Sequence, residues 1–119
     1  MRNQPKYHFF KNTSYALAGF KDIIQNETSF KIELVIAIIL LPVLFFIDVS
    51  LTHKLFMFIT LSGMLIAETI NSAIERVVDL VTLDHHDMAK RAKDVGSTIV
   101  FLSIMVFVVV WGSIIISLF

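Results

Sequence analysis

The chain has 119 residues, and hydrophobic side chains make up 56% of it, more than the roughly 45–50% typical of soluble globular domains. Ten Lys and Arg balance ten Asp and Glu, so the net charge gives no reason to expect a nucleic-acid partner. The sequence contains no cysteine, which excludes disulfides, thiolate nucleophiles and Cys-ligated zinc or iron–sulfur sites.

The first predicted element is an amphipathic helix over about residues 6–27. Apolar side chains recur at steps of three and four residues over 9–24, which is the spacing of one helix face. Lys11 and Lys21 fall on the other side, and this composition is typical of a helix lying in the membrane interface. A core-facing helix of a soluble protein would show the same pattern, so the interfacial assignment depends on the segments that follow.

Three helices that span the membrane are expected next, over residues 28–49, 55–83 and 95–119. The first reaches the required length of about 20 residues if Lys31 and Glu33 lie near the headgroups. The third is the clearest, because 95–119 holds no charged residue over about 37 Å of helix. The sequence therefore predicts an all-α membrane protein that forms a single domain, 1–119.

The basic residues predict the orientation of these helices in the membrane. They cluster before the first span and between the second and third, whereas the first connection offers only Lys54. By the positive-inside rule, the N-terminal helix and residues 82–94 are expected in the cytoplasm and the C-terminus outside.

Four polar residues of the second span form a ladder on one helix face. They are Glu68, Asn71, Glu75 and Asp79. At 100° per residue they share an arc of roughly 80° and spread over about 16 Å. Acids inside a bilayer are costly, and like charges on one face repel unless a cation or a shared proton lies between them, so the ladder favours a functional site. Asn71 alone suits equally well a hydrogen bond that holds helices together.

Two further acids, Glu27 and Glu33, lie at the ends of the neighbouring predicted helices. Both are expected on the cytoplasmic side, where either one can approach Glu75. A pair of carboxylates from different helices is the minimal protein contribution to Mg²⁺, which keeps several waters and takes other ligands from phosphate. By spacing alone, Glu27 is better explained as a solvated charge at a helix end.

The segment before the third span carries histidines, acids and cations. Residues 84–87, Asp-His-His-Asp, do not favour zinc, because neighbouring side chains rarely converge on one ion. Lys90 and Arg91 fit a purely topological role. Lys93, which precedes Gly96 at the membrane surface, suits a phosphate contact. The sequence holds neither a P-loop nor a protein-kinase signature.

The stretch Ala67-Glu-Thr-Ile-Asn-Ser-Ala-Ile-Glu-Arg-Val-Val-Asp79, followed by Arg91-Ala-Lys-Asp-Val-Gly-Ser97, closely resembles the signature of the prokaryotic diacylglycerol kinases. Length, N-terminal helix, three spans and the connection before the third span agree as well. The resemblance implies a homotrimer in the bacterial cytoplasmic (inner) membrane, with active sites shared between subunits. It also implies ATP-dependent and Mg²⁺-dependent phosphorylation of sn-1,2-diacylglycerol to phosphatidic acid, for lipid recycling and phospholipid synthesis.

The resemblance further implies a role for individual residues. Glu68 is the expected general base, Glu27 and Glu75 are expected to hold Mg²⁺, and Asn71 and Asp79 to support the site. ATP contacts are expected from Tyr15, Glu27, Glu75, Asp84, His85, His86, Lys93 and Asp94. Lipid-substrate contacts are expected from His8, Glu33, Glu68, Ser97 and Trp111. The sequence departs from the family pattern in two places, with His8 for a basic residue and Ala16 for a small hydroxyl residue.

Two other functions remain open at this point. A sister branch of the same fold phosphorylates undecaprenol, but Asn71-Ser-Ala-Ile-Glu75 and Val95-Gly-Ser97 are closer to the diacylglycerol branch. An oligomeric membrane channel or scaffold would also place a polar ladder in its interior. Only a kinase predicts ATP consumption that depends on magnesium and on a lipid.

Overall fold

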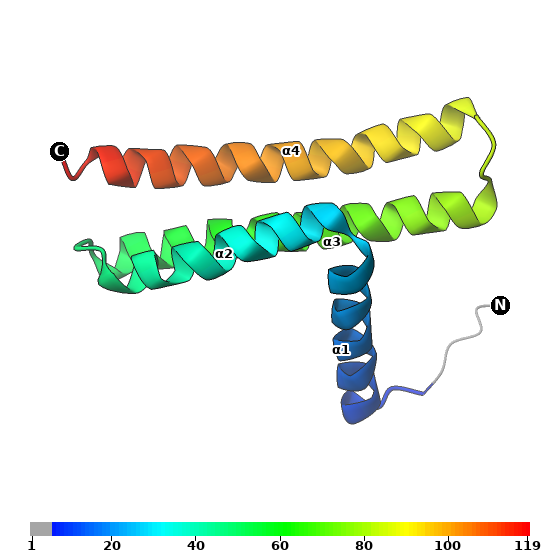
Figure 1. The fold of residues 1–119 in the computed structure, drawn as a ribbon, viewed down its shortest axis with the longest axis horizontal. Coiled ribbons are helices and arrows are strands. Elements are labelled where there is room, and N and C mark those ends of the chain that lie inside the picture. Colours follow the sequence, from blue (N-terminus) through cyan, green and yellow to red (C-terminus); the bar gives the residue numbers. More distant parts are fainter. Residues whose placement is uncertain (1–5) are drawn as a thin grey trace.

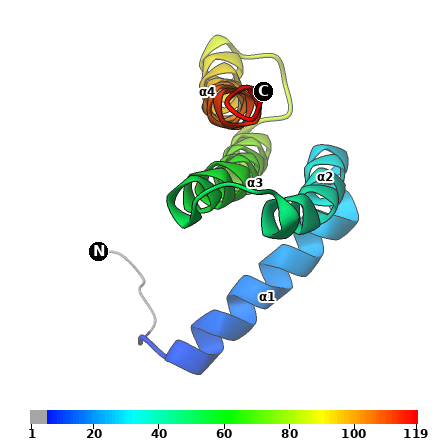
Figure 2. The ribbon, with the colours of Figure 1, turned by 90° about the vertical axis from the view of Figure 1, so that its left-hand side faces the viewer.

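The computed structural model describes residues 6–119, and this part of the chain is all helical. Its elements are α1 (Phe9–Asn26), α2 (Thr28–Phe46), α3 (Leu51–Val81) and α4 (Asp87–Ile116). Figure 1 shows α2, α3 and α4 running lengthwise and α1 lying across their direction. The C-terminus and the α2–α3 connection are at one end, and the α3–α4 connection is at the other. The end-on view in Figure 2 shows α1 extending away from the three long helices.

The three long helices have the length and composition of membrane spans, which confirms that prediction. α2, α3 and α4 contain 19, 31 and 30 residues, or about 28, 46 and 45 Å of helix, against a hydrocarbon layer of about 30 Å. Many of their large apolar side chains are exposed, among them Phe46 at 88% and Val109 at 63%. Such a surface suits lipid, because exposed apolar patches of this extent are rare on soluble monomers.

Both α3 and α4 begin earlier than the sequence pattern predicts. α3 starts at Leu51 rather than at residue 55, because the Ser50 hydroxyl accepts the backbone N–H of His53 at 3.2 Å and caps the helix. α4 starts at Asp87 rather than at residue 95, where His86 Nδ1 accepts the N–H of Met88 at 3.1 Å. The expected loop over 82–94 is therefore only the short connection 82–86.

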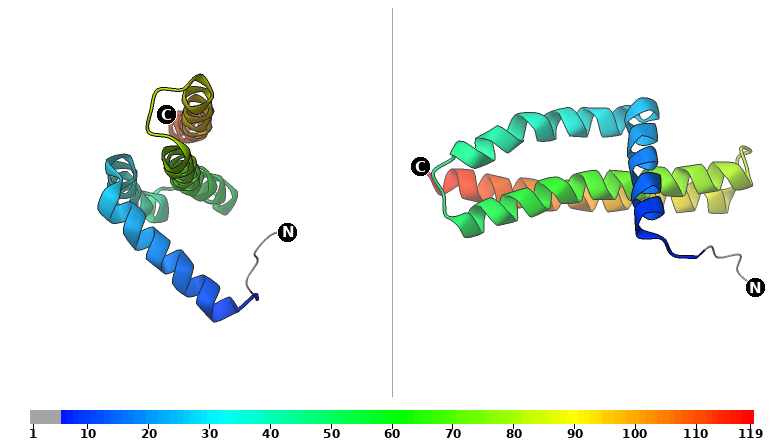
Figure 3. Two further views of the ribbon diagram at one scale, coloured as in Figure 1. Left: turned by 90° about the vertical axis from the view of Figure 1, so that its right-hand side faces the viewer. Right: turned by 90° about the horizontal axis from the view of Figure 1, so that it is seen from below.

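An apolar core closes the end of the bundle that holds the α2–α3 connection. It consists of Ala37, Leu44, Met57, Leu61, Trp111 and Ile114, from all three long helices. The indole Nε1 of Trp111 donates to the backbone oxygen of Met57 at 3.0 Å, so the one polar group of that side chain is satisfied. In the view from below in Figure 3, α2 and α3 meet near this end and α1 joins α2 at its opposite end.

Candidate active site

Four acids come together where α1, α2 and α3 meet. We call Glu27, Glu33, Glu68 and Glu75 the carboxylate cluster. Glu68 lies on α3 and Glu33 on α2, and their exposed fractions are only 8% and 9%. Each of the other three carboxylates is close enough to Glu68 for the charges to interact. The fold thus gathers the expected base, both expected metal ligands and one expected lipid contact.

The joint between α1 and α2 is the single residue Glu27. It follows the last residue of α1 and precedes the first residue of α2, with an extended backbone at φ −115° and ψ 108°. The Ser72 hydroxyl donates to Glu27 Oε1 at 2.6 Å, and Arg76 donates to the same oxygen from Nε at 3.3 Å and Nη2 at 3.2 Å. Arg76 Nη1 donates to Asp22 Oδ2 at 2.8 Å. A turn between helices therefore brings an acid from the end of α1 against α3.

Asn71 links the carboxylate cluster to α4. Its Nδ2 donates to Glu75 Oε1 at 3.3 Å, while its buried Oδ1 has no hydrogen-bond partner within 6–119. Glu33 Oε2 is buried and unpaired in the same part of the chain. A Cβ on Gly96 would overlap Asn71 Oδ1, so glycine is required here for the amide to keep its position between α3 and α4.

The donor set of the cluster fits a magnesium ion that arrives with a nucleotide. Within 6–119 no group of three or more His, Cys, Asp or Glu side chains forms a full metal cage. Mg²⁺ does not need one, because it is usually held by one or two carboxylates, waters and substrate phosphates. All three hydrogen bonds to Glu27 fall on Oε1, which leaves Oε2 for a ligand.

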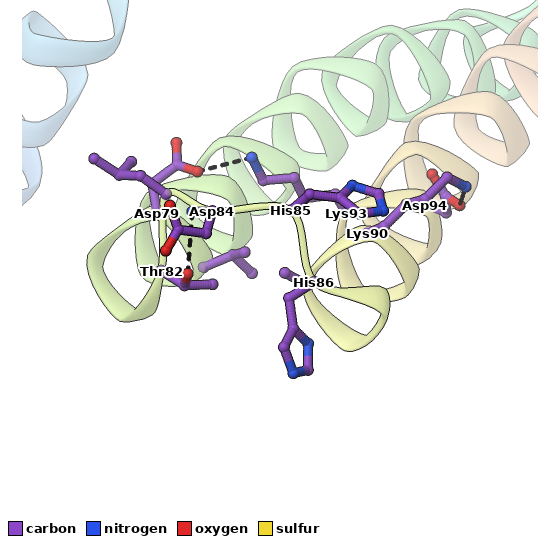
Figure 4. Close-up of a pocket in the computed structure, with 11 residues that line it drawn as sticks. Asp79, Thr82, Asp84, His85, His86, Lys90, Lys93 and Asp94 are labelled. Carbon is purple, nitrogen blue, oxygen red and sulfur yellow. Dashed lines mark hydrogen bonds and ion pairs between the residues drawn. The ribbon is translucent and has the colours of Figure 1, made fainter.

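A second polar region lies between the end of α3 and the start of α4, around a cavity of about 410 Å³ (Figure 4). We call it the connection pocket. It is lined by the residues predicted to contact ATP in this segment, Asp84, His85, His86, Lys93 and Asp94, and by Asp79. Lys93 pairs with Asp79 at 2.7 Å and Lys90 with Asp94 at 2.8 Å. The ring of His86 extends away from these pairs.

Four predicted site residues lie outside both regions. His8 and Tyr15, near the start of α1, line a separate cavity of about 220 Å³. Ser97 is exposed on α4. Trp111 is 5% exposed and packs in the apolar core at the other end of the bundle. Contacts of these residues with substrates stay predictions.

Arg76, Ser72 and Asp22 are residues of the site that the sequence pattern did not indicate. Arg76 lies about 80° around α3 from Glu68, outside the arc of the ladder and toward α1. Hydrogen bonds from Arg76 and Asn26 hold the pKa of Asp22 below its usual value of 3.8. An arginine in the second half of an apolar span was the available signal, because such a charge needs a partner.

Comparison with known proteins places this arrangement in context. A family profile described as prokaryotic diacylglycerol kinase matches residues 14–115. The chain is 36% identical to the diacylglycerol kinase of Haemophilus influenzae, over 90% of this chain and 91% of that one. It is 38% identical to the diacylglycerol kinase of Pseudomonas aeruginosa, over 88% and 85%. It is also 34% identical to the undecaprenol kinase of Bacillus subtilis, over 75% and 72%.

Proposed function

Since the chain belongs to the prokaryotic diacylglycerol kinase family, we propose that it transfers the γ-phosphate of ATP to sn-1,2-diacylglycerol and forms phosphatidic acid, for lipid recycling and phospholipid synthesis. The observation that carries the assignment is a buried acid, Glu68, that lies within a span and is near enough to three further carboxylates for the charges to interact. A lipid hydroxyl reaches such a site from the bilayer, and a nucleotide reaches the connection pocket from water.

Glu68 acts as the general base in the proposed reaction. Its carboxylate accepts the proton of the lipid hydroxyl as that oxygen attacks the γ-phosphorus and the bond to ADP breaks. Glu27 and Glu75 would hold Mg²⁺, which would neutralise phosphate charge. Lys93 exchanges Asp79 for a phosphate oxygen, since its side chain lines the pocket and is only partly buried. Catalysis is then mainly positioning and charge neutralisation.

The proposed location is the bacterial cytoplasmic (inner) membrane, with the N-terminus in the cytoplasm and the C-terminus outside. α1 exposes Phe9, Phe10 and Leu17, whose side chains would face the apolar side of the membrane interface. Lys90, Arg91 and Lys93 lie in the first turns of α4, at the bundle end toward which α1 also lies (Figure 1). The lysines of α1 and the cations at the start of α4 then both face the cytoplasm, as the positive-inside rule requires.

We also propose a homotrimer with active sites shared between subunits. Within one chain, the cavity at His8 and Tyr15 is separate from the connection pocket. A nucleotide site that uses residues from both would therefore draw them from neighbouring chains. The unpaired buried oxygens of Asn71 and Glu33 are further groups that a neighbour or a ligand would satisfy.

The function is tested by one assay with three lipid conditions. Purified protein in detergent receives Mg²⁺ and ATP with diacylglycerol, with undecaprenol or with no added lipid, and ADP release is followed. We expect release that depends on diacylglycerol and a phosphatidic acid product. Faster turnover of undecaprenol would move the substrate to the sister branch, and absence of lipid-dependent turnover would favour the channel or scaffold.

The metal assignment is tested by two acid variants. Glu27→Gln and Glu75→Gln should each raise the Mg²⁺ concentration needed for half-maximal activity, because each removes a charged ligand. Asp48→Asn, an exposed acid near the other end of the bundle, is the matched control and should leave that concentration unchanged. The assignment is wrong if both cluster variants behave like the control.

A further inference from the structure

Arg76 forms a bridge between α1, the α1–α2 joint and α3. One arm of its guanidinium donates to Asp22 on α1, and the other two donors reach a single oxygen of Glu27. Ser72, one helical turn earlier on α3, donates to that same oxygen. Glu27 is therefore held by two residues of the helix that also carries Glu68 and Glu75.

The distribution of these hydrogen bonds fixes one half of the Glu27 carboxylate and leaves the other half open. Three donors converge on Oε1, and none within 6–119 reaches Oε2. A carboxylate with one oxygen saturated in this way has lost most of its rotational freedom. Its second oxygen is then available at a defined position, which lowers the entropic cost of binding a cation.

The charges of the bridge also suit a cation site. Asp22 and Glu27 carry one negative charge each and Arg76 one positive charge, so the trio keeps a net charge of about −1. Asp22 takes up part of the positive charge that Glu27 would otherwise meet. The planar fork of arginine can serve both acids at once, whereas a lysine is a single point charge.

We propose that Arg76 is a positioning residue for the metal ligand Glu27: together with Ser72 and Asp22 it holds Oε1, so that Oε2 meets Mg²⁺. This inference rests on the proposed function in one respect, the assignment of Glu27 to the metal. The opposite role, in which Arg76 occupies Glu27 as a competing cation, predicts the opposite sign in the experiment below.

The test compares Arg76→Gln and Arg76→Lys with the wild-type protein. Mg²⁺ activation is measured by turnover, and Mn²⁺ binding is measured by the electron paramagnetic resonance of free Mn²⁺ with a non-hydrolysable ATP analogue present. For Arg76→Gln we expect about a tenfold weaker response in both measurements, as for other residues that orient a metal ligand. Mg²⁺ activation and Mn²⁺ binding of Arg76→Lys should lie between those of Arg76→Gln and the wild type. The KM for diacylglycerol should stay unchanged in both variants. Lys54→Gln, at the other end of α3, is the matched loss of one cation and should leave Mn²⁺ binding unchanged.

Two further variants separate positioning from simple attachment of α1. Asp22→Asn keeps the hydrogen bonds between Arg76 and Glu27. It should therefore weaken Mn²⁺ binding, but by less than Arg76→Gln does. Ser72→Ala removes one donor to Oε1 and should also weaken Mn²⁺ binding. If Arg76→Gln does not fold, Arg76→Lys and these two variants still test the sign of the effect.

Three results would overturn the proposal. Tighter Mn²⁺ binding in Arg76→Gln would make Arg76 a competitor. Lower thermal stability with unchanged Mn²⁺ binding would make it a purely structural tie. In both cases Glu27→Gln still weakens Mn²⁺ binding, so the metal assignment survives. If Glu27→Gln leaves Mn²⁺ binding unchanged, the metal assignment itself fails and the positioning role fails with it.

Discussion

The half of the bundle around Met57 and the half around Glu68 are built by the same long helices, but their interiors differ in polarity. In the first, apolar side chains fill the interior, and the one polar group of Trp111 is paired. In the second, four acids lie near one another and oxygens of Asn71 and Glu33 are buried without partners. Unpaired buried groups destabilise a fold, so the first half holds the helices together and the second uses that stability for a site.

The largest effect is expected from Glu68→Gln, which should change turnover but not the stability that the apolar half provides. The amide keeps size and hydrogen bonding but cannot accept the proton, so turnover should fall by roughly 10²–10⁴. Stability against unfolding in detergent should not fall, because the change removes a buried charge. Turnover is measured by steady-state kinetics, and nucleotide binding is measured separately with an ATP analogue. Loss of analogue binding equal to the loss of turnover would make Glu68 a nucleotide or metal ligand instead.

A smaller effect is expected from Gly96→Ala. The added Cβ would overlap Asn71 Oδ1, and Asn71 is too buried to move freely, so Glu75 would lose its hydrogen bond and its position. Displacement of site groups by about 1 Å can cost about 10² in turnover.

Gly112→Ala is the matched control for this change. Gly112 has no atom within 4 Å of an added Cβ and lies in the same helix. Alanine there should leave turnover unchanged and should stabilise α4 slightly, because it favours helix more than glycine does. Equal activity of the two variants, measured at the same lipid concentration, would contradict the close contact at Gly96.

Trp111→Phe should affect the apolar half alone. The variant loses the hydrogen bond to the Met57 oxygen, at a cost of about 1 kcal/mol in the free energy of unfolding. The KM for diacylglycerol should stay unchanged, since the indole is buried away from the carboxylate cluster. A raised KM with unchanged stability would instead support the lipid contact that the family resemblance implies.

The smallest effect concerns pH and the attachment of α1. Hydrogen bonds, first from Arg76, hold the pKa of Asp22 below 3.8. A lowered pKa in the folded protein means that the interaction contributes stability above the unfolded pKa of about 3.9 and loses it as pH falls through the folded value. Carbon NMR of the Asp22 carboxyl should show this low pKa, and Arg76→Gln should return it toward 3.8. An unchanged titration in the variant would contradict the ion pair.

The long helices were predictable from the sequence because the bilayer demands long apolar runs, but the first residues of α3 and α4 were not. Hydrophobicity marks where a helix meets lipid, whereas hydrogen bonding decides where it begins. At Ser50 and His86 a side chain caps the backbone well before the apolar run starts. The cations at 90–93 therefore lie in the first turns of α4 and not in a loop.

The acids of the site were predictable in part, because Glu68 and Glu75 share one face of one helix. The position of Glu27 beside them depends on how α1 turns into α2, which periodicity within single helices does not contain. Arg76 shows most clearly that periodicity does not predict contacts between helices. Its partner Asp22 is 54 positions away in sequence, on a helix that comes next to Arg76 only in the fold.

The single-residue joint at Glu27 couples the orientation of α1 to the backbone of the proposed metal ligand. A longer linker would absorb a tilt of α1, but here a tilt must change the backbone of a residue that is itself proposed to bind the metal. Binding free energies are linked reciprocally. If lipids favour the orientation of α1 in which Glu27 Oε2 meets the metal, they strengthen nucleotide binding by the same factor by which bound nucleotide strengthens the binding of those lipids to α1.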